Sequence, residues 1–236
     1  MNKEITIVTM TANRAKDFSN LQSYIQSQTF RNFDWIVVKD TEVPYPKPIA
    51  GERRIQREKQ ENELHSMLEN LRAGLAEVQT PYIAIFEDDD WFSPDYLETM
   101  VGMLRENDLA GFNMEVVYRP SDRTFSRAWN VGHASLSATG WRHQTITPIV
   151  DSIIEEGSVY VDSMLWQTVS GMEGYSTKLK ENTEREGDKG LLYHLGIKGA
   201  SGASPIHTRE LTSSDKSGAL LRSWIGKDAE RYLGGI

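Results

Sequence analysis

The sequence predicts an α/β fold: a mostly parallel central sheet flanked by helices, with a small antiparallel part. Short apolar, β-branched runs alternate with amphipathic helical patterns over the first ninety residues, and crossover helices of this kind join parallel strands. Four acidic residues follow the third apolar run. The length of 236 residues suits one large domain.

Each predicted element rests on hydrophobic periodicity and on proline or glycine signals. In the first half they are a strand at residues 5–9, a helix at 17–28, a strand at 33–38, a proline-rich extended loop at 43–48, a helix at 64–78, a strand at 82–86 and a helix at 94–104. In the second half they are strands at 109–114, 116–119 and 124–129, a helix at 161–168, a strand at 191–195 and a small-residue loop at 198–205.

The composition excludes several classes of protein. The chain has no cysteine, so it forms no disulfide and no thiolate metal site. It carries a net charge of −8, which argues against a surface that holds nucleic acid mainly through phosphates. No apolar run approaches the length of a membrane span. We therefore expect a soluble, cytoplasmic protein with no membrane partner.

The acidic run Glu87-Asp88-Asp89-Asp90 is the strongest local signal of chemistry. Adjacent carboxylates repel one another, and a divalent cation with a preference for oxygen ligands offsets that repulsion. Ligands of open α/β sheets bind at the carboxyl ends of the strands, where this run lies. No glycine-rich phosphate-binding fingerprint follows the first strand. The run therefore predicts a site for Mn²⁺ or Mg²⁺.

Three stretches together resemble the GT-A fold glycosyltransferases of family 2 type. Residues 5–14 are similar to the family's first strand and its following turn, and residues 28–38 resemble its Q-T-Y-x-N-x-E-x-I-V-V stretch. Residues 87–95 resemble its D-x-D-D-x-x-x-P-D motif. The likeness covers residues 1–105, and the stretch from Asn70 to Asp95 resembles phage-encoded members, some of which are thought to glycosylate hydroxymethylated bases in DNA.

The resemblance implies a single GT-A domain over residues 1–236. Residues 1–105 would be its nucleotide-sugar-binding half, and residues 106–236 its acceptor-binding half and C-terminal lid. It implies an inverting, metal-dependent glycosyltransferase that uses a nucleotide diphosphate sugar, with UDP as the expected nucleotide. The acceptor stays open among a modified DNA base, a glycan and a protein side chain. A nucleotidyltransferase and a non-catalytic nucleotide-sugar-binding module are the alternatives.

The resemblance also implies roles for individual residues. The expected nucleotide-sugar contacts are Thr9, Thr11, Arg14, Asp40, Asn70, Glu87, Asp88 and Lys198. The expected metal ligands are Asp89, Asp90 and His207, the catalytic base is Asp162, and the acceptor-binding residues are Trp141 and Arg142.

Two departures from the family pattern leave alternatives open. The sequence Lys39-Asp40-Thr41-Glu42 stands where the family has D-D-G-S, so the base specificity is open. The D-x-D motif begins at Glu87 if residues 94–95 set the alignment, and at Asp88 otherwise.

Overall fold

The computed structural model describes residues 3–12, 14–41, 44–59, 62–182, 191–198 and 213–234. Its strands are β1 (Ile5–Thr11), β2 (Phe33–Lys39), β3 (Glu52–Gln56), β4 (Tyr82–Ile85), β5 (Trp91–Phe92), β6 (Leu109–Phe112), β7 (Met114–Arg119), β8 (Thr124–Trp129), β9 (Thr139–Arg142), β10 (Thr177–Lys180), β11 (His194–Ile197) and β12 (Ser213–Ser214). Its α-helices are α1 (Ala15–Ser27), α2 (Glu63–Leu75), α3 (Tyr96–Glu106), α4 (His143–Glu155), α5 (Val161–Ser170), α6 (Ala219–Ile225) and α7 (Glu230–Leu233). Two 3₁₀ turns, Leu136–Ala138 and Gly226–Ala229, complete the described elements.

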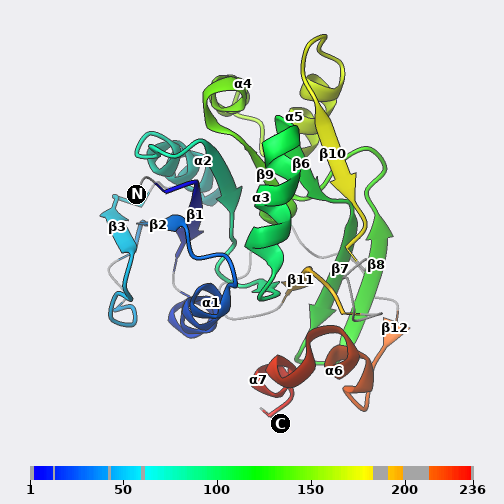
Figure 1. The fold of residues 1–236 in the computed structure, drawn as a ribbon. Helices are drawn as coiled ribbons and strands as arrows, with labels where there is room; N and C mark the ends of the chain where they lie inside the picture. The colour runs from blue at the N-terminus through cyan, green and yellow to red at the C-terminus, as the bar shows by residue number, and fades with distance from the viewer. Residues whose placement is uncertain are drawn as a thin grey trace.

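A seven-stranded sheet in the order β10-β6-β9-β4-β1-β2-β3 forms the centre of the molecule (Figure 1). Strands β4, β1, β2 and β3 run parallel, with Val8 paired to both Ile36 and Ile85. Strand β9 runs antiparallel between β4 and β6, while β10 runs parallel to β6. The mixed, mostly parallel sheet confirms the predicted fold class, and it takes strands from both predicted halves of the chain.

A second sheet, in the order β12-β8-β7-β11-β5, carries most of the antiparallel pairing. Strand β11 runs parallel to β7 and antiparallel to β5, where His194 pairs with Phe92. Because β5 directly follows the acidic run, this pairing brings the late segment at residues 194–198 beside residues 87–90.

Helices cover both faces of the central sheet. At Gly140 in β9, an added Cβ would lie 2.8 Å from the sulfur of Met100 in α3. The next residue, Trp141, points to the other face, where its indole Nε1 donates to Thr147 of α4 at 3.1 Å. Successive residues of a strand face opposite sides, so α3 and α4 lie on opposite faces. Glycine at position 140 allows α3 to approach closely.

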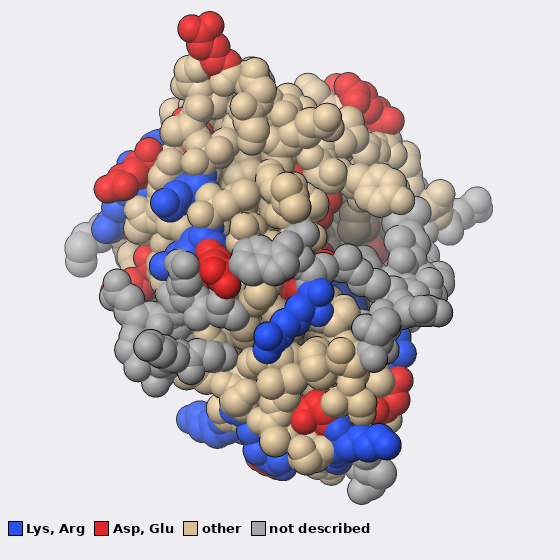
Figure 2. Space-filling model, turned by 90° about the vertical axis from the view of Figure 1, so that its right-hand side faces the viewer, with Lys and Arg blue, Asp and Glu red and all other residues tan. Residues whose placement is uncertain are grey.

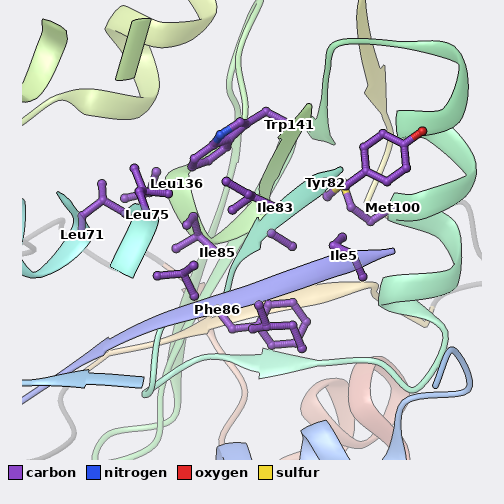
Figure 3. Close-up of a cluster of buried hydrophobic side chains, with 14 of the residues drawn as sticks. Ile5, Leu71, Leu75, Tyr82, Ile83, Ile85, Phe86, Met100, Leu136 and Trp141 are labelled. Atoms are coloured by element: carbon purple, nitrogen blue, oxygen red, sulfur yellow. The ribbon is translucent and has the colours of Figure 1, made fainter. Parts of the chain in front are cut away.

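The main hydrophobic core lies against this sheet. Figure 3 shows part of it, with Trp141 lying beside Leu136 and Ile83. A second, smaller core packs α6 and α7 against β7, β11 and α1. In it the hydroxyl groups of Tyr24 and Tyr232 are hydrogen-bonded at 2.8 Å, which ties α1 to α7 at the lower end of the molecule in Figure 1.

Candidate active site

The acidic run forms a turn between β4 and β5, at the carboxyl edge of the parallel strands. Its three aspartates are buried, with 1%, 6% and 2% of their surface exposed for Asp88, Asp89 and Asp90. Glu87 is more open, with 31% of its side chain exposed. Ligand oxygens of Glu87, Asp89 and Asp90 all lie within 4.8 Å of one another. The fold thus concentrates negative charge at the edge where sheets of this type bind ligands.

Residues at the end of β1 hold one side of the acidic run. The Arg14 guanidinium lies 3.2 Å from Asp88 Oδ1 and donates to Asp89 Oδ2 at 2.7 Å. The Thr11 hydroxyl donates to the other oxygen of Asp88. Tyr45 was not predicted: its hydroxyl lies 2.9 Å from that of Thr11 and accepts the backbone N–H of Arg14 at 3.3 Å. Its place in a proline-rich stretch gave no sign of this role.

Strand β11 and the residue after it hold the other side of the acidic run. Asp90 Oδ2 lies 2.9 Å from Nε2 of His194, and Asp90 Oδ1 accepts the backbone N–H of Ile197 at 3.1 Å. The ammonium of Lys198 lies 3.6 Å from Asp90 Oδ1 and 3.9 Å from Glu87 Oε2. The hydroxyl of Ser137 lies 3.2 Å from the same imidazole nitrogen. Asp90 is therefore both a candidate ligand and a structural link.

Burial and neighbouring charges change the ionisation of this cluster. Burial raises the pKa values of Glu87 and Asp88, more than Lys198 and Arg14 respectively lower them. Burial acts in the same direction on Asp90, but Lys198 and His194 outweigh it and hold the pKa of Asp90 well below its ordinary value. The carboxylates differ in kind: Asp90 is firmly ionised, whereas Glu87 and Asp88 hold protons more readily.

The residues present fit a divalent cation. Asp89 Oδ1 is buried and has no hydrogen-bond partner within the described part of the chain. An unpartnered buried carboxylate oxygen is costly unless a cation or a donor approaches it. The neighbouring ligand atoms are all carboxylate oxygens, which Mg²⁺ and Mn²⁺ prefer. Asp89, supported by Glu87 and Asp90, is therefore the residue best placed to hold such an ion.

A second polar centre lies at the end of β2. One oxygen of the buried Asp40 accepts hydrogen bonds from the Ser66 hydroxyl and, at 3.0 Å, from the Asn70 amide of α2. The other oxygen, Oδ1, is buried without a hydrogen-bond partner among the described residues. Asp40 also lines a pocket of about 470 Å³ between the ends of β2 and β3. Asp40 and Asn70, both predicted to contact the nucleotide, thus lie together at this edge.

Asp162 lies in the first turn of α5 and is half-buried. Its Oδ1 accepts the backbone N–H of Ser163 at 2.7 Å. Burial raises its pKa, and the charges of His133 and Glu115 also act on it. Glu115 also raises the pKa of Lys198, so this one carboxylate acts on both Asp162 and the lysine that contacts the acidic run. Figure 2 shows acidic atoms recessed in a hollow of the face that it draws.

Comparison with known proteins decides the family. The sequence model of glycosyl transferase family 2 matches residues 6–161 of this chain. The chain belongs to glycosyl transferase family 2. No curated protein sequence matches it.

Solved structures of glycosyltransferases share the fold of this family 2 member. Residues 1–349 of TarS from S. aureus superpose with a TM-score of 0.57 and 10% identity over 82% of this chain and 60% of theirs. The same TarS fragment in complex with UDP-GlcNAc gives 0.55 and 11% identity over 83% and 59%. The mannosyltransferase PcManGT from Pyrobaculum calidifontis, in complex with GDP-Man and Mn²⁺, gives 0.52 and 13% identity over 85% and 57%. The chain thus spans 60% or less of these proteins' lengths, and the likeness shows a GT-A fold.

The structure contradicts the predicted acceptor-binding pair of this family 2 chain. Trp141 is completely buried in the core and presents no ring face to a ligand (Figure 3). Arg142 pairs with Tyr82 at the amino end of β4, at the opposite edge of the sheet from the acidic run. Its guanidinium binds Asp108 at 3.2 Å and lies over the Tyr82 ring. Both residues therefore stabilise the fold.

Thr9 is a further correction among the predicted nucleotide contacts. It is fully buried, and its hydroxyl accepts the indole N–H of Trp35 at 3.0 Å inside the sheet. Thr9 lies two residues before the strand end where Thr11 meets Asp88, and its side chain is enclosed by the core at that depth.

Two further expectations concern the histidine ligand of the metal and the absence of a membrane span. His207, the predicted third metal ligand, lies outside the described residues, as does the greater part of the predicted lid. None of the helices that the structure describes has the length and apolar composition needed to cross a bilayer.

Proposed function

We propose that this chain is a metal-dependent, inverting glycosyltransferase that moves a sugar from a nucleotide diphosphate sugar to an acceptor hydroxyl. The observation that carries the proposal is the buried acidic turn, in which Asp89 keeps an unpartnered oxygen beside Glu87 and Asp90. When bound there, Mn²⁺ or Mg²⁺ would stabilise the charge on the departing diphosphate as a Lewis acid. His207 stays a proposed additional ligand.

The chain's own residues would bind the nucleotide around that site. The unpartnered Oδ1 of Asp40 is a free hydrogen-bond acceptor among the described residues, and the imino N–H of a uracil ring is a donor that would suit it. Ser66 and Asn70 fix that carboxylate from the other side. Thr11 and Arg14 hold Asp88 and Asp89 in place, and Lys198 brings a positive charge to the diphosphate. A UDP-sugar is thus the proposed donor, and TarS binds one.

Asp162 would act as the base that takes the proton of the acceptor hydroxyl. An inverting transfer needs a base on the face of the sugar opposite the leaving diphosphate. Asp162 comes from α5, a different element from the acidic turn, and burial raises its pKa. A raised pKa brings a carboxylate closer to the strength that proton abstraction near neutral pH requires.

The acceptor is proposed to be an uncharged molecule that carries a hydroxyl group, such as a glycan. The acidic turn concentrates carboxylates at the proposed donor site, and Glu115 adds negative charge that raises the pKa of Asp162. A polyanion would be repelled by this negative charge. The hydroxymethylated base of phage DNA predicted from the resemblance is the competing acceptor, and the test below compares the two.

The decisive experiment measures metal-dependent hydrolysis and transfer with a panel of UDP- and GDP-sugars. We expect UDP release in the presence of Mn²⁺, none in EDTA, and none from Asp89→Asn. Nuclear magnetic resonance of the product gives its anomeric configuration, which should be opposite to that of the donor. The panel of acceptors contains oligosaccharides and hydroxymethylated duplex DNA. Nucleotide-sugar binding without hydrolysis or transfer would identify a binding module instead.

A further inference from the structure

The acidic turn is balanced by two cations that belong to the chain. The guanidinium of Arg14 lies on Asp88 and Asp89, at 3.2 Å and 2.7 Å. The ammonium of Lys198 lies on Asp90 and Glu87, at 3.6 Å and 3.9 Å. Each cation thus takes two of the four carboxylates.

The two cations are held in different ways. Arg14 presents a planar fork that donates to Asp89 at hydrogen-bond distance, and its backbone N–H is fixed by the hydroxyl of Tyr45. The distances from Lys198 to its two carboxylates are longer than an N–H···O hydrogen bond. A lysine ammonium is a compact, strongly hydrated charge on a flexible stem. Lys198 is therefore the more easily displaced of the two.

The position of Lys198 overlaps the place that a divalent ion would take. Glu87 and Asp90 are two of the three residues whose ligand oxygens converge within 4.8 Å, and Asp89 is the third. Carboxylate oxygens that bind a divalent ion lie about 2.0 to 2.6 Å from it. An ammonium close to the same oxygens would face strong like-charge repulsion from that ion. The two cations therefore exclude each other on the Glu87–Asp90 side.

The backbone of Lys198 allows its side chain to move without disturbing the fold. Its N–H donates to the carbonyl oxygen of Tyr118 in β7 at 2.9 Å, which continues the parallel pairing of β11 with β7. Four rotatable side-chain bonds separate this fixed point from the ammonium. Rotation about them moves the charge by several ångströms while the strand stays paired.

We propose that Lys198 is a tethered competitor of the divalent ion. In the metal-free protein its ammonium neutralises Glu87 and Asp90, and a metal ion has to displace it to bind all three carboxylates. The displaced ammonium is then free to contact a diphosphate. This inference rests on the proposed metal site, and it predicts that metal and nucleotide diphosphate each increase the other's affinity.

The test measures Mn²⁺ binding to nucleotide-free protein by the electron paramagnetic resonance signal of free Mn²⁺. Lys198→Met removes the ammonium and keeps an unbranched side chain. It should bind Mn²⁺ at least about tenfold more tightly than the wild type, because the competitor is gone. Lys180→Met is the matched control, since Lys180 lies in β10 with its ammonium over the Tyr193 ring, and its affinity should equal that of the wild type. Unchanged or weaker binding by Lys198→Met would overturn the proposal.

A second measurement uses the wild-type protein and needs no variant. Acetic anhydride labels exposed lysines, and mass spectrometry gives the labelling rate of each one. Addition of Mn²⁺ should raise the rate at Lys198 by about fivefold or more and leave the rate at Lys180 unchanged. Equal labelling with and without bound Mn²⁺ would contradict the displacement. If the wild type binds no Mn²⁺ at all, both this inference and the proposed metal site fail; if it binds but Lys198 has no effect, only this inference fails.

Discussion

The imidazole of His194 lies 2.9 Å from the carboxylate of Asp90, although 104 residues separate them in the sequence. Both side chains are almost completely buried, with 2% of His194 and 2% of Asp90 exposed. The contact joins β11 to the acidic turn, so the same carboxylate serves the fold and the proposed site.

Replacement of His194 should therefore destabilise the protein. His194→Ala leaves a buried carboxylate without one of its partners, and we expect the free energy of unfolding to fall by about 2–3 kcal/mol. His194→Gln keeps a donor and should lose less. Urea denaturation measures both. His143→Ala is the control, because the His143 imidazole is half-buried and its described side-chain hydrogen bond, at 2.9 Å, is to the uncharged Thr147 hydroxyl. An equal loss of stability there would indicate that the carboxylate contact is unimportant.

Asp89 and Asp90 should respond differently to removal of their charge. Asp89→Asn relieves repulsion and keeps the shape, so we expect the fold to persist while Mn²⁺ binding falls by about tenfold or more. Asp90→Ala loses the contacts to His194 and Ile197 and should lower the free energy of unfolding by about 3 kcal/mol. Calorimetric titration and denaturation separate the two effects. Equal stability of both variants would contradict the structural role of Asp90.

The stability of the metal-free protein should decrease as the pH rises. Burial raises the pKa of Glu87 to about 8 and that of Asp88 to about 7, above their values in the unfolded chain. The unfolded state therefore releases these protons at lower pH, and the folded state loses stability between about pH 4 and pH 8. Asp90 behaves differently, because its pKa is lowered in the folded protein. The stability that ionised Asp90 adds is fully present above about pH 4 and does not change over this range. Denaturation in EDTA at several pH values tests this. The double variant Glu87→Gln, Asp88→Asn should show a smaller decrease.

Asp162→Asn should lower the transfer activity without lowering the stability of the fold. Loss of the base should lower the transfer rate by about 10²-fold or more and leave nucleotide-sugar binding nearly unchanged. In the wild type the rate should fall at acid pH, through a pKa above that of an ordinary aspartate, because burial raises it. The variant should lack this acid limb and be at least as stable at pH 7. Transfer at the wild-type rate would assign the base to another residue.

Asn182 should be essential for the position of β11. Its amide donates to the carbonyl oxygens of Met114 and His194, at 2.9 Å and 2.8 Å, and its oxygen accepts the N–H groups of Tyr193 and His194. Asn182→Asp replaces the donating amide with a buried charge and should lower the free energy of unfolding by about 3 kcal/mol. Asn107→Asp is the control: Asn107 is half-buried and its described side-chain hydrogen bond goes to the carbonyl oxygen of Met103 at 2.9 Å, so this variant should lose far less stability.

The parallel strands β1, β2 and β4 at the centre of the sheet were predictable from the sequence, whereas the antiparallel strand β9 between β4 and β6 was missed. β1, β2 and β4 are rich in apolar and β-branched residues, and the predicted strands at 5–9, 33–38 and 82–86 agree with them. The edge strands were missed. β3 carries Arg53 and Arg54, and β10 carries Lys178 and Lys180, because an edge strand needs no apolar face. Helix α4 was also missed, since it contains Pro148.

The candidate site was also only partly predictable from the sequence. The acidic run is contiguous, so its charge repulsion is readable from the sequence alone. The partners of Asp90 lie in β11, and no local pattern connects segments so far apart. Trp141 was assigned to the acceptor site but lies in the core. An aromatic side chain suits both a ligand-binding surface and a hydrophobic core, and only the structure shows that Trp141 is buried.

The separation between the acidic turn and β11 has a consequence for synthesis of the protein. Asp90 leaves the ribosome 104 residues before His194. At about 5–20 residues per second, the turn waits for about 5–20 s without its imidazole and ammonium partners. During that interval Arg14 is the only one of the two described counter-ions already made, and free Mg²⁺ in the cell is the cation at hand. During synthesis the acidic turn is thus exposed to the divalent cations of its surroundings before Lys198 exists.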